Sequence, residues 1–414
     1  MARVILGVGA GIAAYKACEL LRLFKESGHS VRVVPTPDAL RFVGAPTWEA
    51  LSGEPVTADV WSGVADVPHV KLGQAADLVI IAPATADLLA RAAAGRSDDL
   101  LTATLLTARC PVVYAPAMHT EMWEHPATQH NAATLRARGA VVVEPAVGRL
   151  TGKDSGKGRL PDPGALFELA EKVLRDGGTS AAARDGRSLP LAGRKVLLSA
   201  GGTREELDPV RFLGNWSTGR QGYAFARSAV AQGADVTLVA ANVELPSPAG
   251  VTVIRVVSAR DMHAVMLAEA ASADVIIMTA AVADFRPVAR ADAKIKKDGA
   301  LPPPIELTEN PDILADLARR RTERGPAGQV IVGFAAETDP DLDAAKAKLA
   351  RKGSDLLVMN QVGDGQGFGP GDNEWVVLDS AGGVTGIPRR SKDALADEVL
   401  AMASARLGAG SRDS

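Results

Sequence analysis

Glycine-rich turns stand in both halves of the chain at positions where phosphate groups could bind. Gly9-Ala10-Gly11 follows the apolar run Val4–Val8 and precedes a segment with helical periodicity. In the second half, Gly201-Gly202-Thr203 follows a similar run, and Ser217-Thr218-Gly219 opens a helical segment. The first N–H groups of a helix have no partners within it and lie at its positive end, so such turns are typical of phosphate sites. The sequence therefore predicts an anion-binding crevice in each half.

Titratable side chains that could act on a bound molecule also occur in both halves, and each has a purely structural alternative. His69 could be a hydrogen-bonded strand residue. Lys294 could belong to a solvated basic loop, and Lys348 and Lys352 could lie on the polar face of a surface helix. His119 and the histidines that follow it are too irregularly spaced to indicate a metal site, so metal ligands stay unknown.

The elements that must position these residues occur twice. A strand, a glycine turn, a helix and a second strand near the N-terminus recur as Lys195–Ala200, Gln221–Gln232 and Val236–Ala240. The apolar run Ala76–Leu89 is echoed by Ala273–Phe285. Continuous apolar runs are typical of parallel strands that are covered on both faces. We therefore predict an α/β fold with two tandem doubly wound domains, Rossmann- or flavodoxin-like, built on parallel sheets.

A polar segment separates the two halves. Arg175–Gly193 is rich in small and charged residues and poor in bulky apolar ones, which is typical of a flexible linker. We place the boundary near Ser188, with one domain over residues 1–188 and the other over residues 189–414.

Composition excludes several classes of protein. The 414 residues include 46 Lys plus Arg and 49 Asp plus Glu, so the net charge of −3 does not favour a nucleic-acid partner. No apolar run is long enough to span a membrane, and the glycines near the N-terminus do not fit a secretion signal. Cys18 and Cys110 cannot form a disulfide framework, which indicates a cytoplasmic protein.

The residues around the Gly9–Gly11 turn narrow the choice of ligand for the crevice of the N-terminal half. Gly9, Gly11 and Ala14 match the GxGxxA dinucleotide pattern, which is weak evidence when alone. An NAD-binding domain carries an acidic residue at the end of its second strand, where this chain has Thr36. A hydroxyl beside a phosphate site favours a mononucleotide such as FMN.

Five motifs of the N-terminal half support this interpretation: GIAAYK (11–16), PHVKL (68–72), APATADLLARAAAG (82–95), DDLLT (98–102) and PAMHTEMW (116–123). They resemble the homo-oligomeric flavin-containing cysteine decarboxylases, in particular those that act on 4′-phosphopantothenoylcysteine. The resemblance implies FMN as cofactor and His69 as the active-site histidine. It implies flavin contacts at Gly9, Gly11, Thr36, Thr85, Ala86 and Thr102. Met118 and His119 would contact the substrate.

This chain departs from that family at the proton donor. Bacterial members carry a cysteine in a mobile clamp, whereas the corresponding segment Leu150–Leu160 has Thr151 and Gly152 there. These two residues are still expected to contact the substrate. Threonine is too weak an acid to replace a thiol. His119 stands where the family has asparagine, and we hypothesise that it supplies the proton.

The C-terminal half carries its own set of motifs: AGGTREELDPVRFLGNWSTGRQGYAFA (200–226), AAVADF (280–285), AKIKK (293–297), ENPDIL (309–314) and VGFAAET (332–338). They resemble the phosphopantothenate–cysteine ligases, which use CTP and Mg²⁺. The resemblance implies that Lys294 forms the acyl-cytidylate and that Asn215 acts on it. It implies CTP contacts at Thr279, Ala280, Asp284, Lys294, Asn310, Pro311, Asp312, Ile313, Phe334, Lys348 and Lys352.

The whole chain thus resembles the bifunctional coenzyme A biosynthesis family, CoaBC or Dfp. The resemblance implies that 4′-phosphopantothenate, L-cysteine and CTP are the substrates. It also implies homo-oligomers, with a trimer-based dodecamer formed by the flavin domain and dimer contacts in the ligase domain. Three alternatives remain open. The first is an active ligase with a catalytically weak flavin-binding oligomerisation domain, and the second is an NAD(P)-dependent oxidoreductase with tandem Rossmann domains. The third is a non-enzymatic flavin-binding regulatory subunit, which would release no pyrophosphate from CTP and phosphopantothenate.

Overall fold

The structure is a computed structural model that describes residues 1–59, 67–150, 154–176, 189–296, 304–324, 328–337, 341–361 and 371–410. The chain forms two compact units. The first takes in residues 1–193, 230–235 and 247–251, and the second takes in residues 194–229, 236–246 and 252–414. The predicted boundary after residue 188 stays a prediction, because residues 177–188 lie outside the described part.

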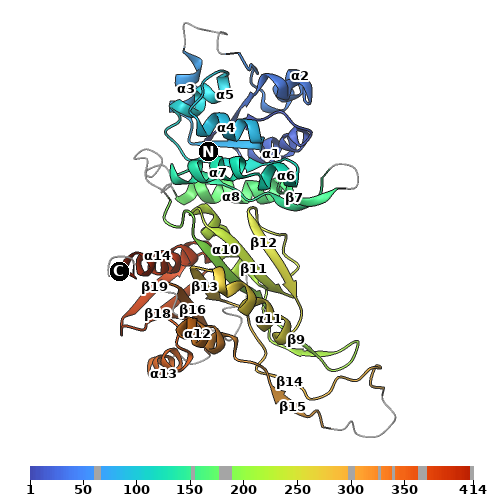
Figure 1. Cartoon of the computed structure of the whole chain (residues 1–414), viewed down its shortest axis with the longest axis vertical. Helices are drawn as coiled ribbons and strands as arrows, with labels where there is room; N and C mark the ends of the chain where they lie inside the picture. Colours follow the sequence, from blue (N-terminus) through green and yellow to red (C-terminus); the bar gives the residue numbers. More distant parts are fainter. Residues whose placement is uncertain are drawn as a thin grey trace. The chain divides into compact units, whose positions relative to one another are not determined.

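A five-stranded sheet forms the centre of the N-terminal unit (Figure 1). Its order is β2-β1-β3-β4-β5, and every neighbouring pair is parallel. The strands are β1 (Arg3–Val8), β2 (Ser30–Pro35), β3 (Leu78–Ala84), β4 (Val112–Pro116) and β5 (Val141–Val142). All seven residues of β3 are buried, as predicted for a strand covered on both faces. The strand order reverses between β1 and β3, where ligands of such sheets bind.

Helices alternate with these strands. They are α1 (Ala14–Glu26), η1 (Pro37–Arg41), α2 (Ala45–Ser52), α3 (Pro68–Ala75), α4 (Ala86–Ala93), α5 (Leu100–Thr107), α6 (Thr120–Glu124), α7 (Pro126–Ala137) and α8 (Pro163–Asp176). One core cluster packs Ile5, Val79 and Ile81 of the sheet against residues of α4, α5 and α7. An antiparallel hairpin, β6 (Ala146–Arg149) and β7 (Ser155–Arg159), lies beside α6 (Figure 1).

The C-terminal unit contains an eight-stranded sheet of order β12-β11-β8-β13-β16-β17-β18-β19. The strands are β8 (Lys195–Gly201), β11 (Asp235–Ala241), β12 (Val251–Val256), β13 (Val275–Met278), β16 (Val330–Glu337), β17 (Leu356–Gln361), β18 (Asn373–Asp379) and β19 (Val384–Arg390). From β8 through β17 the neighbouring strands are parallel. The doubly wound α/β prediction is therefore confirmed in both halves.

One edge of this sheet differs from the expected all-parallel arrangement. β17, β18 and β19 pair antiparallel. Strands joined by a short turn can pair only in this way, and Gly382, with a φ of +95°, lies in the turn between β18 and β19.

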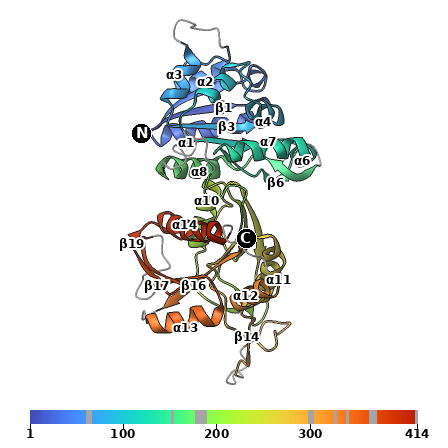
Figure 2. The same cartoon turned by 60° about the vertical axis from the view of Figure 1, so that its left-hand side comes forward.

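The helices of this unit are α10 (Arg220–Ala231), α11 (Ala259–Glu269), η3 (Ala270–Ser272), α12 (Ile313–Arg324), α13 (Leu342–Lys352) and α14 (Lys392–Gly410). Figure 2 shows α13 and α14 on opposite sides of the strands β16 and β17. Two short ribbons complete the unit: β9 (Arg204–Glu206) with β10 (Phe212–Gly214), and β14 (Phe285–Pro287) with β15 (Leu307–Glu309). In the described part of the chain, no helix combines the length and apolarity needed to cross a membrane.

Candidate active sites

The turn after β1 approaches the end of β3 very closely. The backbone N–H of Gly9 donates a hydrogen bond to the carbonyl oxygen of Pro83 at 3.0 Å. A Cβ atom on Gly9 would lie 2.5 Å from that same oxygen, far inside van der Waals contact. Only glycine fits here, so the turn keeps its backbone open at the point where the strand order reverses.

Thr85 and its neighbours form the other side of this crevice. Thr85 caps α4, because its Oγ1 accepts a hydrogen bond from the N–H of Leu88 at 3.2 Å. A Cβ on Gly11 would lie 4.0 Å from Thr85 Cγ2, so the two loops meet. Ala86 is the first residue of α4. At the end of β2, Thr36 is buried and caps η1. The predicted flavin residues Gly9, Gly11, Thr36, Thr85 and Ala86 thus follow the carboxyl ends of β1, β2 and β3.

Thr102 serves the protein in a different way. It forms a reciprocal capping box with Asp99 at the start of α5. Its hydroxyl lies 2.8 Å from Asp99 Oδ1 and accepts hydrogen bonds from the N–H groups of Asp98 and Asp99. A hydroxyl has one proton and two lone pairs, and all of them are engaged here. The Thr102 hydroxyl is therefore committed to the helix cap, which leaves its carbon atoms for contact with a ligand.

His69 lies in a helix, α3, so the alternative that it is a strand residue is wrong. Pro68 at the first helical position favours this local structure. The His69 carbonyl accepts a hydrogen bond from Thr107 Oγ1 at 2.7 Å, which ties α3 to α5. Its side-chain Nδ1 is buried and has no hydrogen-bond partner among the described residues. An unsatisfied buried nitrogen is uncommon, and it is typical of a site that binds a ligand.

Met118 and His119 lie against the hairpin that carries residues 151 and 152. The N–H of Met118 donates to the carbonyl of Gly158 at 2.9 Å. A Cβ on Gly158 would lie 2.1 Å from the Met118 carbonyl oxygen, so β7 passes directly over this loop. The His119 side chain is exposed and does not cap α6. Thr151 and Gly152 themselves lie outside the described residues.

The two cysteines of the chain, and Trp123 at the end of the motif PAMHTEMW (116–123), have structural roles. The family resemblance implies that residues 116–123 help recognise the substrate, but Trp123 is only 2% exposed and its side chain belongs to the core. Cys110 is likewise buried. Burial raises the pKa of the Cys18 thiol, which disfavours the reactive thiolate. Within the described ranges, no group of three or more His, Cys, Asp or Glu side chains could hold a metal ion.

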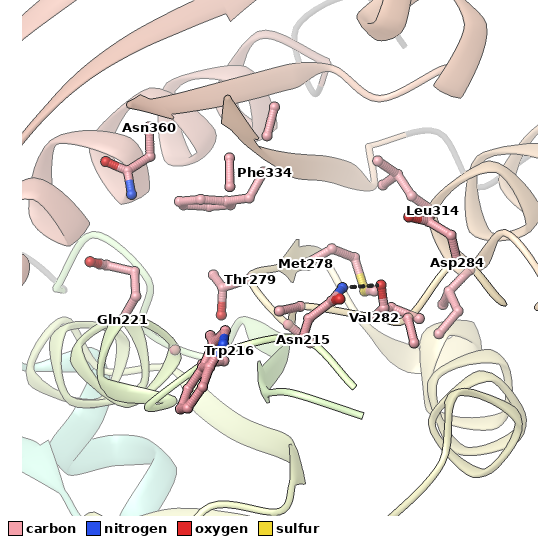
Figure 3. A pocket seen from close by; sticks show the side chains of 18 of the residues that line it. Asn215, Trp216, Gln221, Met278, Thr279, Val282, Asp284, Leu314, Phe334 and Asn360 are labelled. Atoms are coloured by element: carbon pink, nitrogen blue, oxygen red, sulfur yellow. Dashed lines mark hydrogen bonds between the residues drawn. The ribbon is translucent and has the colours of Figure 1, made fainter. Parts of the chain in front are cut away.

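The C-terminal unit has a cavity of about 850 Å³ where β13, β16 and β17 end (Figure 3). Every predicted ligase residue except Lys294 lines it: Asn215, Thr279, Ala280, Asp284, Asn310, Pro311, Asp312, Ile313, Phe334, Lys348 and Lys352. These residues come from separate segments of the chain. Their convergence on one cavity is the main geometric feature of this unit.

Hydrogen bonds hold the floor of the cavity. Asn215 Nδ2 donates to the carbonyl of Val282 at 3.0 Å, as Figure 3 shows. Thr279 Oγ1 donates to the carbonyl of Ser199 at 2.5 Å. The Asn310 side-chain amide donates to the carbonyl of Ala283 at 2.8 Å. These contacts fix the segment that follows β13 against strand β8 and against the segments that carry Asn215 and Asn310.

Charge and aromatic contacts shape the walls. Lys348 Nζ lies 3.0 Å from Glu337 Oε1, and Lys352 is paired with Asp312. Phe334 packs edge-to-face against Trp375, with ring centroids 5.4 Å apart. The cavity thus offers cations beside a rigid aromatic wall, which suits a nucleotide.

Lys294 does not line the cavity; its side chain is exposed. The backbone of the next residue, Ile295, is hydrogen-bonded to Asp208 and Arg211, which lie far from it in the sequence. The N–H of Ile295 donates to Asp208 Oδ2 at 3.1 Å, and Arg211 Nη2 donates to the Ile295 carbonyl at 2.7 Å. Arg211 in turn forms an ion pair with the buried Asp208 carboxylate at 2.6 Å.

The two glycine-rich turns of this half differ in role. Ser217, Thr218 and Gly219 line the cavity ahead of α10. Gly201-Gly202-Thr203 is not among the residues that line it. The N–H of Thr203 donates instead to the carbonyl of Ala281 at 3.3 Å. A Cβ on Gly202 would lie 2.5 Å from the Asn215 carbonyl oxygen. This turn therefore permits close backbone packing, and a phosphate-binding role for it stays a prediction.

Sequence reasoning missed one end of the cavity. Arg220 and Gln221, which lie in the ligase motif over residues 200–226 but were given no role there, line it together with Asn360, Asn373, Trp375 and Lys392. Asn373 and Trp375 belong to β18 and Lys392 begins α14, and the expected all-parallel sheet did not include these elements. The only signal for Lys392 was a lysine at the beginning of a helical segment, which is too common to stand out.

The fold and its two crevices define a tandem α/β protein with one ligand-binding sheet edge in each half. Residues 1–175 match the family model described as Flavoprotein, and residues 191–406 match the one described as DNA/pantothenate metabolism flavoprotein C-terminal domain. Over 404 residues the chain is 57% identical to the coenzyme A biosynthesis bifunctional protein CoaBC of Mycobacterium tuberculosis, covering 96% of this chain and 95% of the relative. The chain belongs to the CoaBC family of bifunctional coenzyme A biosynthesis proteins.

More distant relatives and solved structures show similarity over the whole chain or over each half. The CoaBC protein of Vibrio vulnificus is 41% identical over 410 residues, 98% of each chain. The crystal structure of a CoaBC C-terminal domain is 35% identical, covering 53% of this chain and 99% of that domain, with a TM-score of 0.45. The FMN-dependent cysteine decarboxylase SpaF is 34% identical, covering 43% of this chain and 98% of that one, with a TM-score of 0.37.

Proposed function

We propose that this chain joins 4′-phosphopantothenate to L-cysteine with CTP and then decarboxylates the product to 4′-phosphopantetheine with FMN. Membership of the CoaBC family makes it a bifunctional enzyme of coenzyme A biosynthesis with decarboxylase and ligase activities. The observation that carries the finer proposal is the convergence of the predicted CTP residues on one cavity. Side chains that served only a solvated surface would not be expected to meet there.

The ligase reaction must activate a carboxylate, which is a poor acylating agent. CTP would convert it into an acyl-cytidylate with release of pyrophosphate, after which the cysteine amine attacks the acyl carbon and CMP leaves. The N–H groups at Ser217–Gly219, Lys348 and Lys352 supply positive charge for the phosphates. The Asn215 amide, held through its Nδ2 by Val282, has no partner for its oxygen among the described residues, and this oxygen would position the intermediate. Lys294 would have to approach the cavity when the nucleotide binds.

Mg²⁺ would enter this cavity with the triphosphate. Mg²⁺ prefers oxygen ligands and is commonly held by one or two carboxylates together with substrate phosphates. Asp284 and Asp312 are carboxylates of the cavity wall that fit this requirement.

The residues of the first crevice fit FMN. Gly9 leaves no room for a side chain, no side chain caps the start of α1, and the buried His69 Nδ1 lacks a partner among the described residues. Bound FMN would supply the two-electron oxidation that makes the substrate carboxylate easy to lose, and the reduction that follows. The α1 N-terminus would hold the flavin phosphate. His69 and Met118 would orient the substrate.

His119 is our candidate for the proton donor that replaces the family's cysteine. Its side chain is exposed beside the hairpin, and imidazole can donate a proton near neutral pH. Full decarboxylation by a His119→Asn variant, at neutral and mildly alkaline pH, would show that His119 is not the essential acid.

Two measurements test the proposal against its alternatives. Purified protein should show the absorption spectrum of FMN and should not respond to NAD(P)H; the opposite result favours a nicotinamide-dependent oxidoreductase. Release of CO₂ from 4′-phosphopantothenoylcysteine separates an active decarboxylase from a flavin-binding oligomerisation domain. Light scattering tests the proposed trimer-based dodecamer, and cell fractionation tests the cytoplasmic location.

A further inference from the structure

Four basic side chains line the cavity of the C-terminal unit, and they fall into two pairs. Lys348 and Lys352 lie on α13, and each has a carboxylate partner. Arg220 and Lys392 are the first residues of α10 and α14. Neither has a carboxylate within ion-pair distance in the described part of the chain. Arg220 and Lys392 therefore carry positive charges that no carboxylate of the described residues neutralises by an ion pair.

The surroundings of Lys392 show that this charge is held in place. With the Asn373 amide turned so that its oxygen faces the lysine, Lys392 Nζ donates to that oxygen at 3.0 Å. Burial lowers the pKa of Lys392, and the positive charge of Arg220 lowers it further, against a smaller opposing effect of Asp372. The exposed Arg220 and the half-buried Lys392 thus bring two like charges from different helices to one end of the cavity.

Contacts between α10 and α14 maintain this arrangement. Gln221 Nε2 donates to the carbonyl of Lys392 at 3.3 Å, and Arg227 forms an ion pair with Asp393 at 2.9 Å. The Gln221 Oε1 atom remains buried without a partner among the described residues. Figure 3 shows Gln221 and Asn360 at one end of the cavity, away from Asp284 and Leu314.

We propose that Arg220 and Lys392 bind a phosphate group of a ligase substrate at this end of the cavity. An anion between the two cations would remove their repulsion and would accept charge-assisted hydrogen bonds from both. The inference rests on the proposed function, in which both CTP and 4′-phosphopantothenate carry phosphate. The shared chemistry is a phosphate monoester or terminal phosphate, and the experiment distinguishes its two sources.

The test uses calorimetric titration of the full-length protein and its variants. Lys392→Gln and Arg220→Gln remove the two charges, and Lys392→Arg retains one. Lys346→Gln is the matched control, because Lys346 is exposed on α13 and pairs with Asp343 outside the cavity. Each protein is titrated with CTP, cytidine, 4′-phosphopantothenate and pantothenate. The FMN spectrum and the melting temperature verify that each variant folds. If Lys392→Gln does not fold, Arg220→Gln still tests the site, because it replaces an exposed side chain.

We expect Lys392→Gln and Arg220→Gln to weaken one phosphorylated ligand by about 10- to 100-fold, the range for a lost charge-assisted contact. Cytidine and pantothenate should bind as before, and Lys346→Gln should behave as wild type. The ligand that is weakened identifies the source of the phosphate. Unchanged affinity for both phosphorylated ligands overturns this inference alone. Wild-type protein that binds neither CTP nor 4′-phosphopantothenate contradicts the proposed function, and the inference fails with it.

Discussion

The Asp208 carboxylate accepts a hydrogen bond from the backbone N–H of Ile295 at 3.1 Å, although 87 positions separate the two residues. Through this contact the loop after β9 holds the residue next to Lys294, the lysine to which we assign acyl-cytidylate formation. Arg211 reinforces the contact, because it donates to the carbonyl oxygen of the same residue, Ile295, and pairs with the Asp208 carboxylate. The position of the Lys294 loop is therefore set by residues that do not themselves line the cavity.

Replacement of Asp208 should impair the ligase and spare the decarboxylase. Asp208→Asn keeps the size of the side chain but removes the charge that holds Arg211 and the Ile295 N–H. We expect CTP-dependent pyrophosphate release to fall by about 10- to 100-fold, since misplacement of a reactive group by an ångström has an effect of this size. Decarboxylation of added 4′-phosphopantothenoylcysteine should remain at the wild-type rate. Equal loss of both activities would instead indicate general unfolding.

The same residue should make stability depend on acid pH. The Arg211 guanidinium, together with nearby backbone N–H groups, holds the pKa of Asp208 well below its usual range. A lowered carboxyl pKa stabilises the fold at every pH above the unfolded-state value of about 3.9 and ceases to do so as pH falls through the folded value. The difference in free energy of unfolding between wild type and Asp208→Asn should be constant from about pH 5 to 8 and shrink below about pH 4. Denaturant titrations along this pH series measure it, and a constant difference at acid pH contradicts the assignment.

Gly9 and Gly11 provide a matched pair for the first crevice. Gly9→Ala would place a Cβ 2.5 Å from the Pro83 carbonyl oxygen, whereas Gly11→Ala meets nothing closer than 4.0 Å. We expect Gly9→Ala to destabilise the protein by about 1–3 kcal/mol and to release FMN. Gly11→Ala should change stability by less than about 0.5 kcal/mol, so any loss of flavin there reports contact with the flavin itself. Wild-type FMN content and stability in Gly9→Ala would refute the close-approach argument.

His69 should be needed for decarboxylation but not for folding. Its Nδ1 is buried without a partner in the described part of the chain. Replacing the imidazole therefore breaks no hydrogen bond made by that atom. His69→Asn should retain FMN and ligase activity and lose decarboxylation by at least about 100-fold, a typical effect for an acid–base or orienting group. His130→Asn, at an exposed position of α7, is the control and should be unaffected. A wild-type decarboxylation rate in His69→Asn would remove this residue from the active site.

Much of this architecture could be predicted from the sequence because its strongest signals are local. The apolar runs of β1 and β3, and the glycine turn at Gly9, each need only a few neighbouring residues to be read. The role of Thr102 could not be predicted in this way, since whether its hydroxyl is free depends on the capping box with Asp99. Lys392 was missed because its place in the cavity depends on the antiparallel edge, and pairing between distant strands leaves little trace in local sequence.

Both proposed activities can be observed in a single incubation. Full-length protein is mixed with CTP, Mg²⁺, L-cysteine and 4′-phosphopantothenate, and the products are followed over time by mass spectrometry. We expect CMP and pyrophosphate, transient 4′-phosphopantothenoylcysteine, and its conversion into 4′-phosphopantetheine with loss of CO₂. Intact CTP and unreacted 4′-phosphopantothenate, in a protein that carries its flavin, would contradict the proposed function.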